Sequence, residues 1–252
     1  MNQSERLTAI LERLTTDGSV AVGTVARDFD VSAATVRRDL QLLESQRLLS
    51  RTHGGAVADG VLFELPLRYK SGRQTEQKRR IAREAATRVR DGSAIGMIGG
   101  TTTTEVARAL VDRSELTIVT NALNIAAEMA VRPNLKLLVT GGIARPESYE
   151  LVGPIAESSL EGLHLSVAFL GVDGVSTKAH MTTHHEAEAG VDRALIERAE
   201  HVIVVADSSK IGRSAFARIC RLTAVDELIT DDGAGASEVN ALREAGLRVT
   251  LV

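Results

Sequence analysis

The sequence of 252 residues has little of several residue types, and each shortage excludes a class of protein. It has one cysteine, Cys220, which rules out a disulfide within the chain and a cysteine-rich zinc site. It has no tryptophan and only 2% aromatic residues, so the core must be built from Ala, Val, Leu and Ile. No apolar run approaches the ~18 residues of a membrane span, and the charged, periodic start is unlike a signal peptide. We therefore expect a soluble cytoplasmic protein without membrane contacts.

The net charge of the chain is also small. The formal net charge is −3, from 30 Lys+Arg and 33 Asp+Glu, which argues against a polybasic nucleic-acid coat and against a binder of anionic membranes. Hydrophobic residues make up 44% and charged residues 25%, as in folded globular chains. The length allows one large domain or two unequal ones.

Residues 1–57 show the pattern of a winged helix-turn-helix. A first amphipathic helix carries apolar side chains at helical spacing and ends at Asp17-Gly18. An edge strand over 19–21, a short helix over 23–29 and a third helix from the N-cap Ser32 to about Gln46 follow. Two short strands, 48–51 and 52–57, then surround a glycine turn. Three helices followed by a hairpin form this DNA-binding layout.

The third predicted helix has one apolar and one polar face. Val36, Leu40 and Leu43 lie together within ~60° of arc and should face the core. The opposite side and its flanks carry small residues near the start of the helix and then arginines: Ala34, Thr35, Arg37, Arg38, Gln41 and Ser45. Small residues let a helix enter the major groove, and arginine forks onto guanine or phosphate. A solvated face with two arginines is the alternative, but the combination of cap, apolar stripe and polar face favours DNA.

This segment contains Val31-Ser32, Thr35–Leu40, Leu43-Glu44, Arg51 and His53-Gly54-Gly55-Ala56. On these residues it resembles the DeoR family of bacterial transcriptional regulators. The resemblance implies that the third helix reads the major groove and that the hairpin is the wing, although His53 could equally be a turn residue without a DNA role. The predicted DNA-binding residues are Ser32, Ala33, Thr35, Arg37, Arg38, Arg51 and His53. Because residues 1–57 are formally neutral, DNA binding would need a local basic patch.

A connector over 58–77 is predicted to lead into a second domain over 78–252. A basic stretch begins in this connector and continues into the following helix; it could add phosphate contacts, and a solvated linker is the simpler account. Beyond it, apolar strands alternate with helices, which predicts an α/β domain with a largely parallel, doubly wound sheet. Strands are predicted at 93–98, 117–119, 135–139, 167–172, 201–206, 227–229 and 247–251, and helices at 78–90, 104–110, 122–131, 155–163, 186–199 and 237–244.

Polar or glycine-rich clusters follow the predicted strands. They are Gly99–Thr104, Thr120-Asn121, Gly141-Gly142, Asp173-Gly174, Asp207–Lys210 and Thr230–Asp232. Ligands of such sheets bind beyond the carboxyl ends of the strands, so the clusters should border one pocket, although each alone is a normal polar turn. Glycines and threonines at a helix start suit phosphate. No Walker loop or G-x-G-x-x-G fingerprint is present, so a small phosphorylated ligand fits better than NAD or ATP, and no cofactor is predicted.

The resemblance to the DeoR family extends through these clusters. It includes Leu151–Pro154, Gly171–Gly174, Glu186-Ala187 and Ala206–Lys210, and it indicates the family's sensor domain, which is similar in fold to ribose-5-phosphate isomerase. The resemblance implies that Gly100–Thr104 hold a phosphate, that Lys78 or Lys210 assists, and that Asp173 lies near sugar hydroxyls. The predicted effector-binding residues are Lys78, Gly99, Gly100, Thr101, Thr102, Thr103, Thr104, Thr120, Asn121, Gly142, Asp173 and Lys210.

Catalysis and metal binding are less well supported by the sequence. Isomerisation needs a base and an enediolate stabiliser. The isomerases that this domain resembles have a second acid soon after the Asp-Gly motif and then a Lys in a glycine-rich stretch, whereas no acid follows Asp173-Gly174 closely here. Lys178 remains, and Glu186 or Glu188 could serve as a base, so residual chemistry is not excluded. On a helix, His180 and His184 would share a face while His185 is turned about 100° away, which is weak evidence for zinc. Cys220 is expected to be a small buried residue.

The sequence as a whole predicts a transcriptional regulator rather than an enzyme. We expect a repressor of sugar-metabolism genes that binds double-stranded operator DNA and is released by a phosphorylated sugar or related metabolite. Paired half-sites imply a homo-oligomer, a dimer or higher. The alternatives are a sugar-phosphate isomerase-like enzyme with an appended DNA-binding module and a redox or nucleotide sensor.

Overall fold

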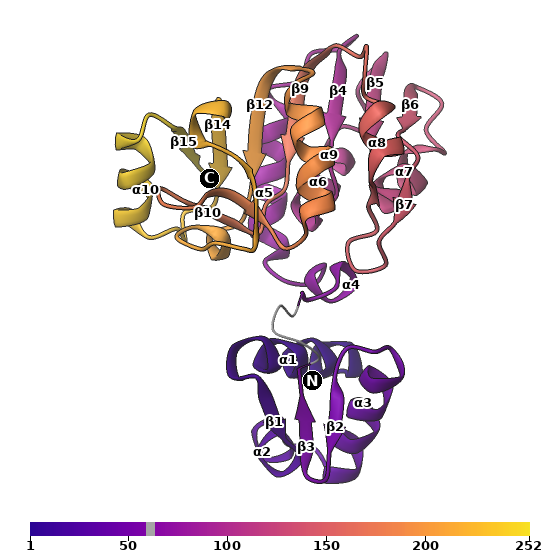
Figure 1. Cartoon of the computed structure of the whole chain (residues 1–252), viewed down its shortest axis with the longest axis vertical. Helices are drawn as coiled ribbons and strands as arrows, with labels where there is room; N and C mark the ends of the chain where they lie inside the picture. Colours follow the sequence, from indigo (N-terminus) through magenta and orange to yellow (C-terminus); the bar gives the residue numbers. More distant parts are fainter. Residues whose placement is uncertain (59–63) are drawn as a thin grey trace. The chain divides into compact units, whose positions relative to one another are not determined.

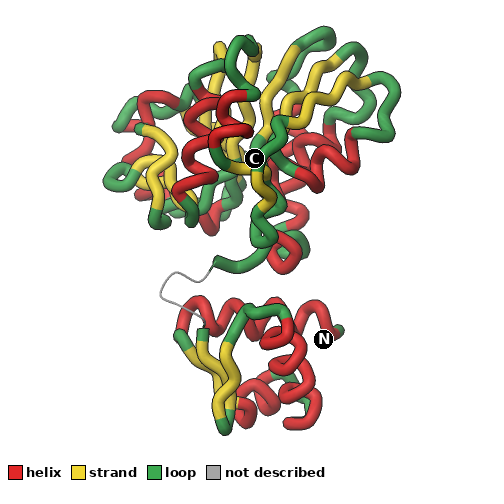
Figure 2. Tube along the Cα trace, turned by 45° about the vertical axis from the view of Figure 1, so that its right-hand side comes forward, coloured by secondary structure: helices red, strands yellow, loops and turns green. Residues whose placement is uncertain are grey.

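The computed structural model describes residues 1–58 and 64–252, which fold into two compact units, Met1–Arg73 and Gln74–Val252 (Figures 1 and 2). The boundary falls inside the segment 58–77 that was expected to connect the domains, and residues 59–63 of that segment lie outside the described residues. Helix α4 (Leu67–Lys70) also lies in this segment, and it belongs to the first unit. Leu65 and Tyr69 are buried in that unit's core, and Tyr69 Oη donates to Gln46 Oε1 at 2.6 Å. Part of the segment 58–77 thus folds with the first unit.

Up to residue 58, the first unit has the predicted order of helices and strands. Its elements are α1 (Gln3–Asp17), β1 (Ser19–Ala21), α2 (Val22–Asp28), α3 (Ala33–Ser45), β2 (Ser50–Thr52) and β3 (Gly55–Val57). The strands form an antiparallel sheet in the order β1-β3-β2, which confirms 19–21 as an edge strand. Gly55 is required where β3 pairs with β1, because a Cβ there would lie 1.9 Å from the Val20 carbonyl oxygen.

The core of the first unit forms between the apolar faces of the helices. The predicted stripes of α1 and α3 are buried, with Val36 and Leu43 at 0% exposure. Asp39 on α3 is also buried, which the sequence pattern did not indicate. Its carboxylate receives Arg6 Nε at 2.8 Å and Gln3 Nε2 at 3.3 Å, both from α1. A buried carboxylate is tolerated where such partners satisfy it.

The second unit is built on a seven-stranded parallel sheet, which confirms the predicted α/β fold. The strand order is β15-β14-β12-β9-β4-β5-β6. The strands are β4 (Ala94–Met97), β5 (Leu116–Thr120), β6 (Leu135–Val139), β9 (Leu165–Leu170), β12 (Ala199–Val205), β14 (Glu227–Thr230) and β15 (Arg248–Leu251). The helices are α5 (Thr75–Ala86), α6 (Thr101–Ala109), α7 (Leu123–Met129), α8 (Pro154–Ser158), α9 (Glu186–Ile196) and α10 (Ala236–Glu244).

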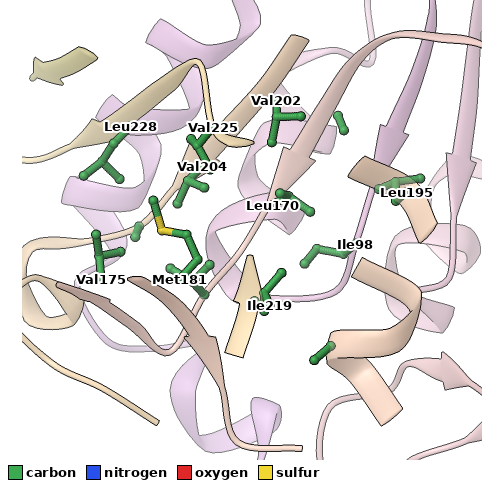
Figure 3. Close-up of a cluster of buried hydrophobic side chains, with 14 of the residues drawn as sticks. Ile98, Leu170, Val175, Met181, Leu195, Val202, Val204, Ile219, Val225 and Leu228 are labelled. Carbon is green, nitrogen blue, oxygen red and sulfur yellow. The ribbon is translucent and has the colours of Figure 1, made fainter. Parts of the chain in front are cut away.

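Helices cover both faces of this sheet and enclose two apolar cores. On one face α5, α6 and α7 pack against the sheet. On the other, α8, α9 and α10 pack against side chains such as Leu170, Val204 and Leu228 (Figure 3). Met181 and Ile219 extend this second core from a smaller sheet. The inner strands are covered on both faces and are largely continuous apolar runs rather than alternating ones, whereas the edge strands β6 and β15 are partly exposed.

Several short elements lie outside the seven-stranded sheet. Strands β7 (Ile143–Ala144) and β8 (Leu151–Val152) form a hairpin, and β10 (Gly174–Ser176), β11 (His180–Thr183) and β13 (Ala217–Cys220) form an antiparallel sheet. The 3₁₀ turns η1 (Ser208–Lys210) and η2 (Leu222–Ala224) complete the unit. The helical placement considered for His180 and His184 was wrong, because His180 begins a strand that pairs with β10 and β13. None of the helices in the described ranges has the length and apolar character that a membrane crossing requires.

Candidate functional site

The outward face of α3 is arranged as its sequence predicts. Ser32 is the N-cap: its Oγ accepts the Thr35 backbone N–H at 3.1 Å and lies 2.9 Å from Thr35 Oγ1. Arg37 and Arg38 are exposed, as are Ala34 and Gln41 on the same side. The hydroxyls of Ser32 and Thr35 are thus engaged in starting the helix. The two guanidinium groups remain on the surface, one turn further along.

The hairpin that follows α3 carries the remaining predicted DNA contacts. Strands β2 and β3 pair through Thr52 and Gly55, and His53 is exposed in the turn between them. Arg51 is exposed on β2; its backbone N–H donates to Glu44 Oε1 at 3.2 Å, and its Nε lies 3.5 Å from Glu44 Oε2. An exposed ion pair of this kind is weak, so a phosphate can compete for the guanidinium. Ala33 is half-buried at the start of α3.

The ion pair between Arg6 and Asp39 fixes α3 from its buried side. The Asp39 side chain is 1% exposed and that of Arg6 12%. The pair ties the middle of α3 to the first turns of α1, so it sets how α3 presents its outer face. Sequence reasoning missed it; the available signal was an aspartate one turn after the core residue Val36.

In the second unit, the loop from Gly99 into α6 lies at the carboxyl end of β4. Gly100 is the N-cap residue of α6 with φ +128°, a conformation that favours glycine. Its carbonyl oxygen accepts the hydroxyls of Thr103 at 3.0 Å and Thr104 at 2.6 Å. Thr102 is buried and Thr101 half-buried. Two of the four predicted hydroxyls therefore brace the turn, and the first-turn amides, which have no acceptor within a helix, are the groups suited to an anion.

The next strand contributes Thr120 and Asn121, both buried. Thr120 Oγ1 accepts the Ala122 backbone N–H at 3.1 Å. Asn121 Nδ2 donates to Glu150 Oε2 at 3.0 Å and to the Leu151 carbonyl at 3.3 Å. Glu150, which the sequence did not single out, thus connects the end of β5 to the β7–β8 segment. Thr120 has a structural role in the turn.

Asp173 and Lys210 come together, although they are 37 positions apart. Lys210 Nζ donates to Asp173 Oδ1 at 3.0 Å. Thr183 Oγ1 donates to Glu188 Oε2 at 2.9 Å and lies 3.4 Å from Asp173 Oδ2. Glu188 in turn pairs with Arg145. A continuous polar network therefore joins η1, β9, β11, α9 and the β7–β8 segment.

Four members of this region escaped sequence reasoning as ligand-site candidates: Arg145, Glu150, Thr183 and Asp192. Asp192 is 1% exposed on α9. Burial first, and then the negative charges of Glu150 and Glu188, raise the pKa of Asp192 well above its usual range, which favours its neutral form. Within the described residues, its Oδ1 has no hydrogen-bond partner, and neither has Asn121 Oδ1.

The two other predicted effector residues lie in different settings. Lys78 is buried on α5, with 3% exposure. Gly142 follows β6 with φ +118°, beside β8, where a Cβ would lie 2.8 Å from the Val152 carbonyl oxygen. The close approach of β8 to the backbone before β7 is enough to explain why position 142 is a glycine.

Cys220 is half-buried at the end of β13. Burial, with a smaller contribution from Asp192, raises the pKa of its thiol to about 11. We predict that the native protein reacts with an aromatic disulfide reagent at pH 8 about 100-fold more slowly than the urea-unfolded chain, because the thiolate is the reacting species. Equal rates in the two states, followed by absorbance, would contradict this environment for the thiol.

No three His, Cys, Asp or Glu side chains in residues 1–58 and 64–252 are grouped so that they could hold a metal ion. His184 Nε2 lies 3.8 Å from Asp173 Oδ1, and His185 is the N-cap of α9, with Nδ1 accepting the Ala187 N–H at 3.1 Å. The histidines thus border the polar network and the start of α9.

A winged helix-turn-helix joined to a parallel-sheet domain with a polar network at its strand ends defines a DNA-binding transcriptional regulator with a sensor domain. The family models agree with this class: the DeoR-like helix-turn-helix domain matches residues 6–60 and the DeoR C-terminal sensor domain matches residues 73–232. The chain belongs to the DeoR family.

The similar proteins include other regulators. The putative aga operon transcriptional repressor of Escherichia coli O157:H7 is 37% identical over 252 residues, which cover 99% of this chain and 94% of the relative. The glycerol-3-phosphate regulon repressor of Escherichia coli (strain K12) is 32% identical over 251 residues, with complete coverage of both chains.

Among solved structures, ribose 5-phosphate isomerase A from Methanocaldococcus jannaschii is 18% identical with a TM-score of 0.41, covering 54% of each chain. The probable sor operon regulator from Shigella flexneri is 12% identical with a TM-score of 0.47, covering 71% of this chain and 92% of that one.

Proposed function

We propose that this regulator is a repressor of sugar-metabolism genes that leaves its operator when it binds a phosphorylated sugar or a related metabolite. One observation carries the proposal: the chain has both an exposed arginine face on α3 and, in its sensor domain, a glycine–threonine loop at a helix start. Gly100 of this loop lies next to Gly171, two residues before Asp173, whose carboxylate pairs with Lys210. The arginine face suits double-stranded DNA, and the loop with its neighbours suits a small anion with hydroxyl groups.

The DNA-binding half of the proposal depends on few charges. Arg37 and Arg38 on α3 and Arg51 on β2 are the exposed cations of the predicted surface. Arginine pairs with guanine in the major groove through two hydrogen bonds, and with phosphate through one or two. Since residues 1–57 are formally neutral, non-specific affinity should be modest, and binding should need two units on paired half-sites of an operator. The proposed active form is therefore a homo-oligomer.

The effector half of the proposal assigns the phosphate to the first turn of α6. The amides after Gly100 and the positive end of the helix dipole favour an oxyanion. Asp173 accepts hydrogen bonds from hydroxyls, and Lys210, which now pairs with Asp173, donates to ligand oxygens. The effector releases DNA because it binds more tightly to the conformation in which the paired DNA-binding units do not match the operator.

The enzymatic alternative is not favoured by the placement of its candidate groups. Lys178 is exposed at the β10–β11 turn, and Glu186 is exposed at the start of α9. Glu188 is buried, but its carboxylate is already engaged by Arg145 and Thr183. We propose that the chain has no isomerase activity. Turnover of aldose phosphates that disappears in Glu186→Gln or Lys178→Ala would overturn this.

The proposed function is tested by gel shift with the full-length protein and the promoter region of its own operon. A panel of phosphorylated sugars and their unphosphorylated parents is added to the preformed complex. Release by at least one phosphorylated sugar, and not by its parent, is the expected result. Complexes that persist with every phosphorylated sugar tried contradict the effector model, and absence of a sequence-specific complex contradicts the DNA model.

A further inference from the structure

The side chain of Glu150 covers the phosphate-type loop. A Cβ placed on Gly99 would lie 2.3 Å from Glu150 Oε1 and 2.6 Å from its carboxyl carbon, so the carboxylate rests directly on the backbone of the loop. The residue is 6% exposed. The first turn of α6 begins two residues after Gly99, and its positive end stabilises a nearby carboxylate as it would a phosphate.

The same side chain also engages a second predicted effector group. Asn121 Nδ2 donates to Glu150 Oε2 at 3.0 Å. Glu150 therefore lies against the start of the loop and engages an amide that was also assigned to the ligand. Gly99 and Asn121 come from the ends of neighbouring strands β4 and β5, which places the carboxylate where a ligand of this fold is expected.

A phosphate entering this site meets negative charge. Glu188 lies on the connected network, and its carboxylate and that of Glu150 both act on buried Asp192. Like charges brought together in a desolvated site repel each other, so an anionic ligand and the Glu150 carboxylate compete for the loop.

The backbone that carries Glu150 is fixed, so the side chain is the part that can move. The Arg145 N–H donates to the Glu150 carbonyl at 2.8 Å, and the Leu151 N–H donates to the Asn121 carbonyl at 2.8 Å. Rotation about the side-chain bonds of Glu150 would uncover Gly99 and break the hydrogen bond from Asn121 Nδ2, which keeps its bond to the Leu151 carbonyl.

We propose that Glu150 is an internal competitor for the effector's phosphate: its carboxylate occupies the loop when the site is empty and must turn away when an oxyanion binds. The inference rests on the proposed function and deepens it, because it makes Glu150 the residue that sets the effector concentration needed for release. Replacing Glu150 should therefore tighten effector binding, whereas replacing a residue that binds the ligand should weaken it.

The test is calorimetric titration of the full-length protein with inorganic phosphate. This probe has the oxyanion of the proposed effector but no sugar. Glu150→Gln keeps the size of the side chain and removes its charge, and Glu150→Ala empties the position. Both variants are expected to bind phosphate at least about tenfold more tightly than the unaltered protein. Glu161→Gln, an exposed glutamate after α8 with the same change in net charge, is expected to bind as the unaltered protein does.

Unchanged or weaker phosphate binding in both variants overturns the inference, and weaker binding makes Glu150 a ligand-binding residue instead. Tightening in Glu161→Gln equal to that in Glu150→Gln also overturns it, because the effect is then one of net charge. Thermal unfolding of each variant confirms that the fold persists. This outcome is separable from the proposed function, which fails if the operator complex of the unaltered protein is indifferent to phosphorylated sugars.

Discussion

Arg38→Ala is expected to lower the affinity for a specific operator about 10- to 100-fold, because one arginine that forks onto a base contributes about 1–3 kcal/mol of discrimination. Arg38 is exposed on α3, and no hydrogen bond or ion pair of its side chain contributes to the described structure, so the fold should be unaffected. Fluorescence anisotropy of a labelled operator fragment at one fixed salt concentration measures the effect, since electrostatic binding depends steeply on salt.

Arg132→Ala is the matched control. Arg132 is exposed after α7 in the sensor domain, and its replacement removes the same charge at a distance in sequence from the predicted DNA surface. We expect its operator affinity to match that of the unaltered protein. If Arg38→Ala retains full operator affinity, the assignment of the recognition face is wrong. If both variants weaken binding equally, the contribution of Arg38 is one of total charge.

Gly100→Ala is expected to give a repressor that binds its operator but is no longer released by its effector. Gly100 has φ +128°, and an added Cβ would lie 3.1 Å from Thr103 Oγ1, so alanine must distort the turn whose amides are proposed to hold the phosphate. The backbone strain costs about 1–3 kcal/mol, which a domain of ordinary stability tolerates. The concentration of phosphorylated sugar that half-dissociates the operator complex should rise at least about tenfold.

Gly92→Ala is the matched control, because it introduces backbone strain at a glycine outside the proposed phosphate site. Gly92 also has a positive φ, +76°, but no atom lies within 4 Å of an added Cβ, and it precedes β4 at the opposite end of the strand from Gly100. Its effector response should stay unchanged while its melting temperature falls. A Gly100→Ala protein that is released at the usual effector concentration would show that the phosphate binds elsewhere.

The elements of the first unit could be predicted because each depends on local chemistry. Ser32 caps α3 through a bond to a residue three positions away, and the 3.6-residue spacing of Val36, Leu40 and Leu43 defines the buried side without any knowledge of partners. Asp39 was not recognised as buried because its partner Arg6 is 33 positions earlier. Helix α4 was missed because its packing against α1 also depends on distant residues.

The proposed ligand site also has features that could be predicted from the sequence and features that could not. The topology of a parallel sheet brings strand ends to one edge, so the clusters containing Asp173 and Lys210 could be predicted to meet. The pairing of Arg145 with Glu188 and the position of Glu150 on Gly99 could not, because they depend on the conformation of the β7–β8 segment, which has no periodic pattern. Nor does the sequence distinguish hydroxyls that face a ligand from those that brace a turn, as Thr103 and Thr104 do.

The Arg6–Asp39 pair also bears on the electrostatics of the DNA-binding unit. Asp39 directly follows Arg38 in the sequence, yet its carboxylate is enclosed and compensated by a cation from α1 while the guanidinium of Arg38 faces solvent. Residues 1–57, which are formally neutral, thereby have an uneven charge distribution: the negative charge in the middle of α3 is buried, and positive charge stays on the outer face. A duplex approaching that face meets a local field that the overall charge of the unit does not describe.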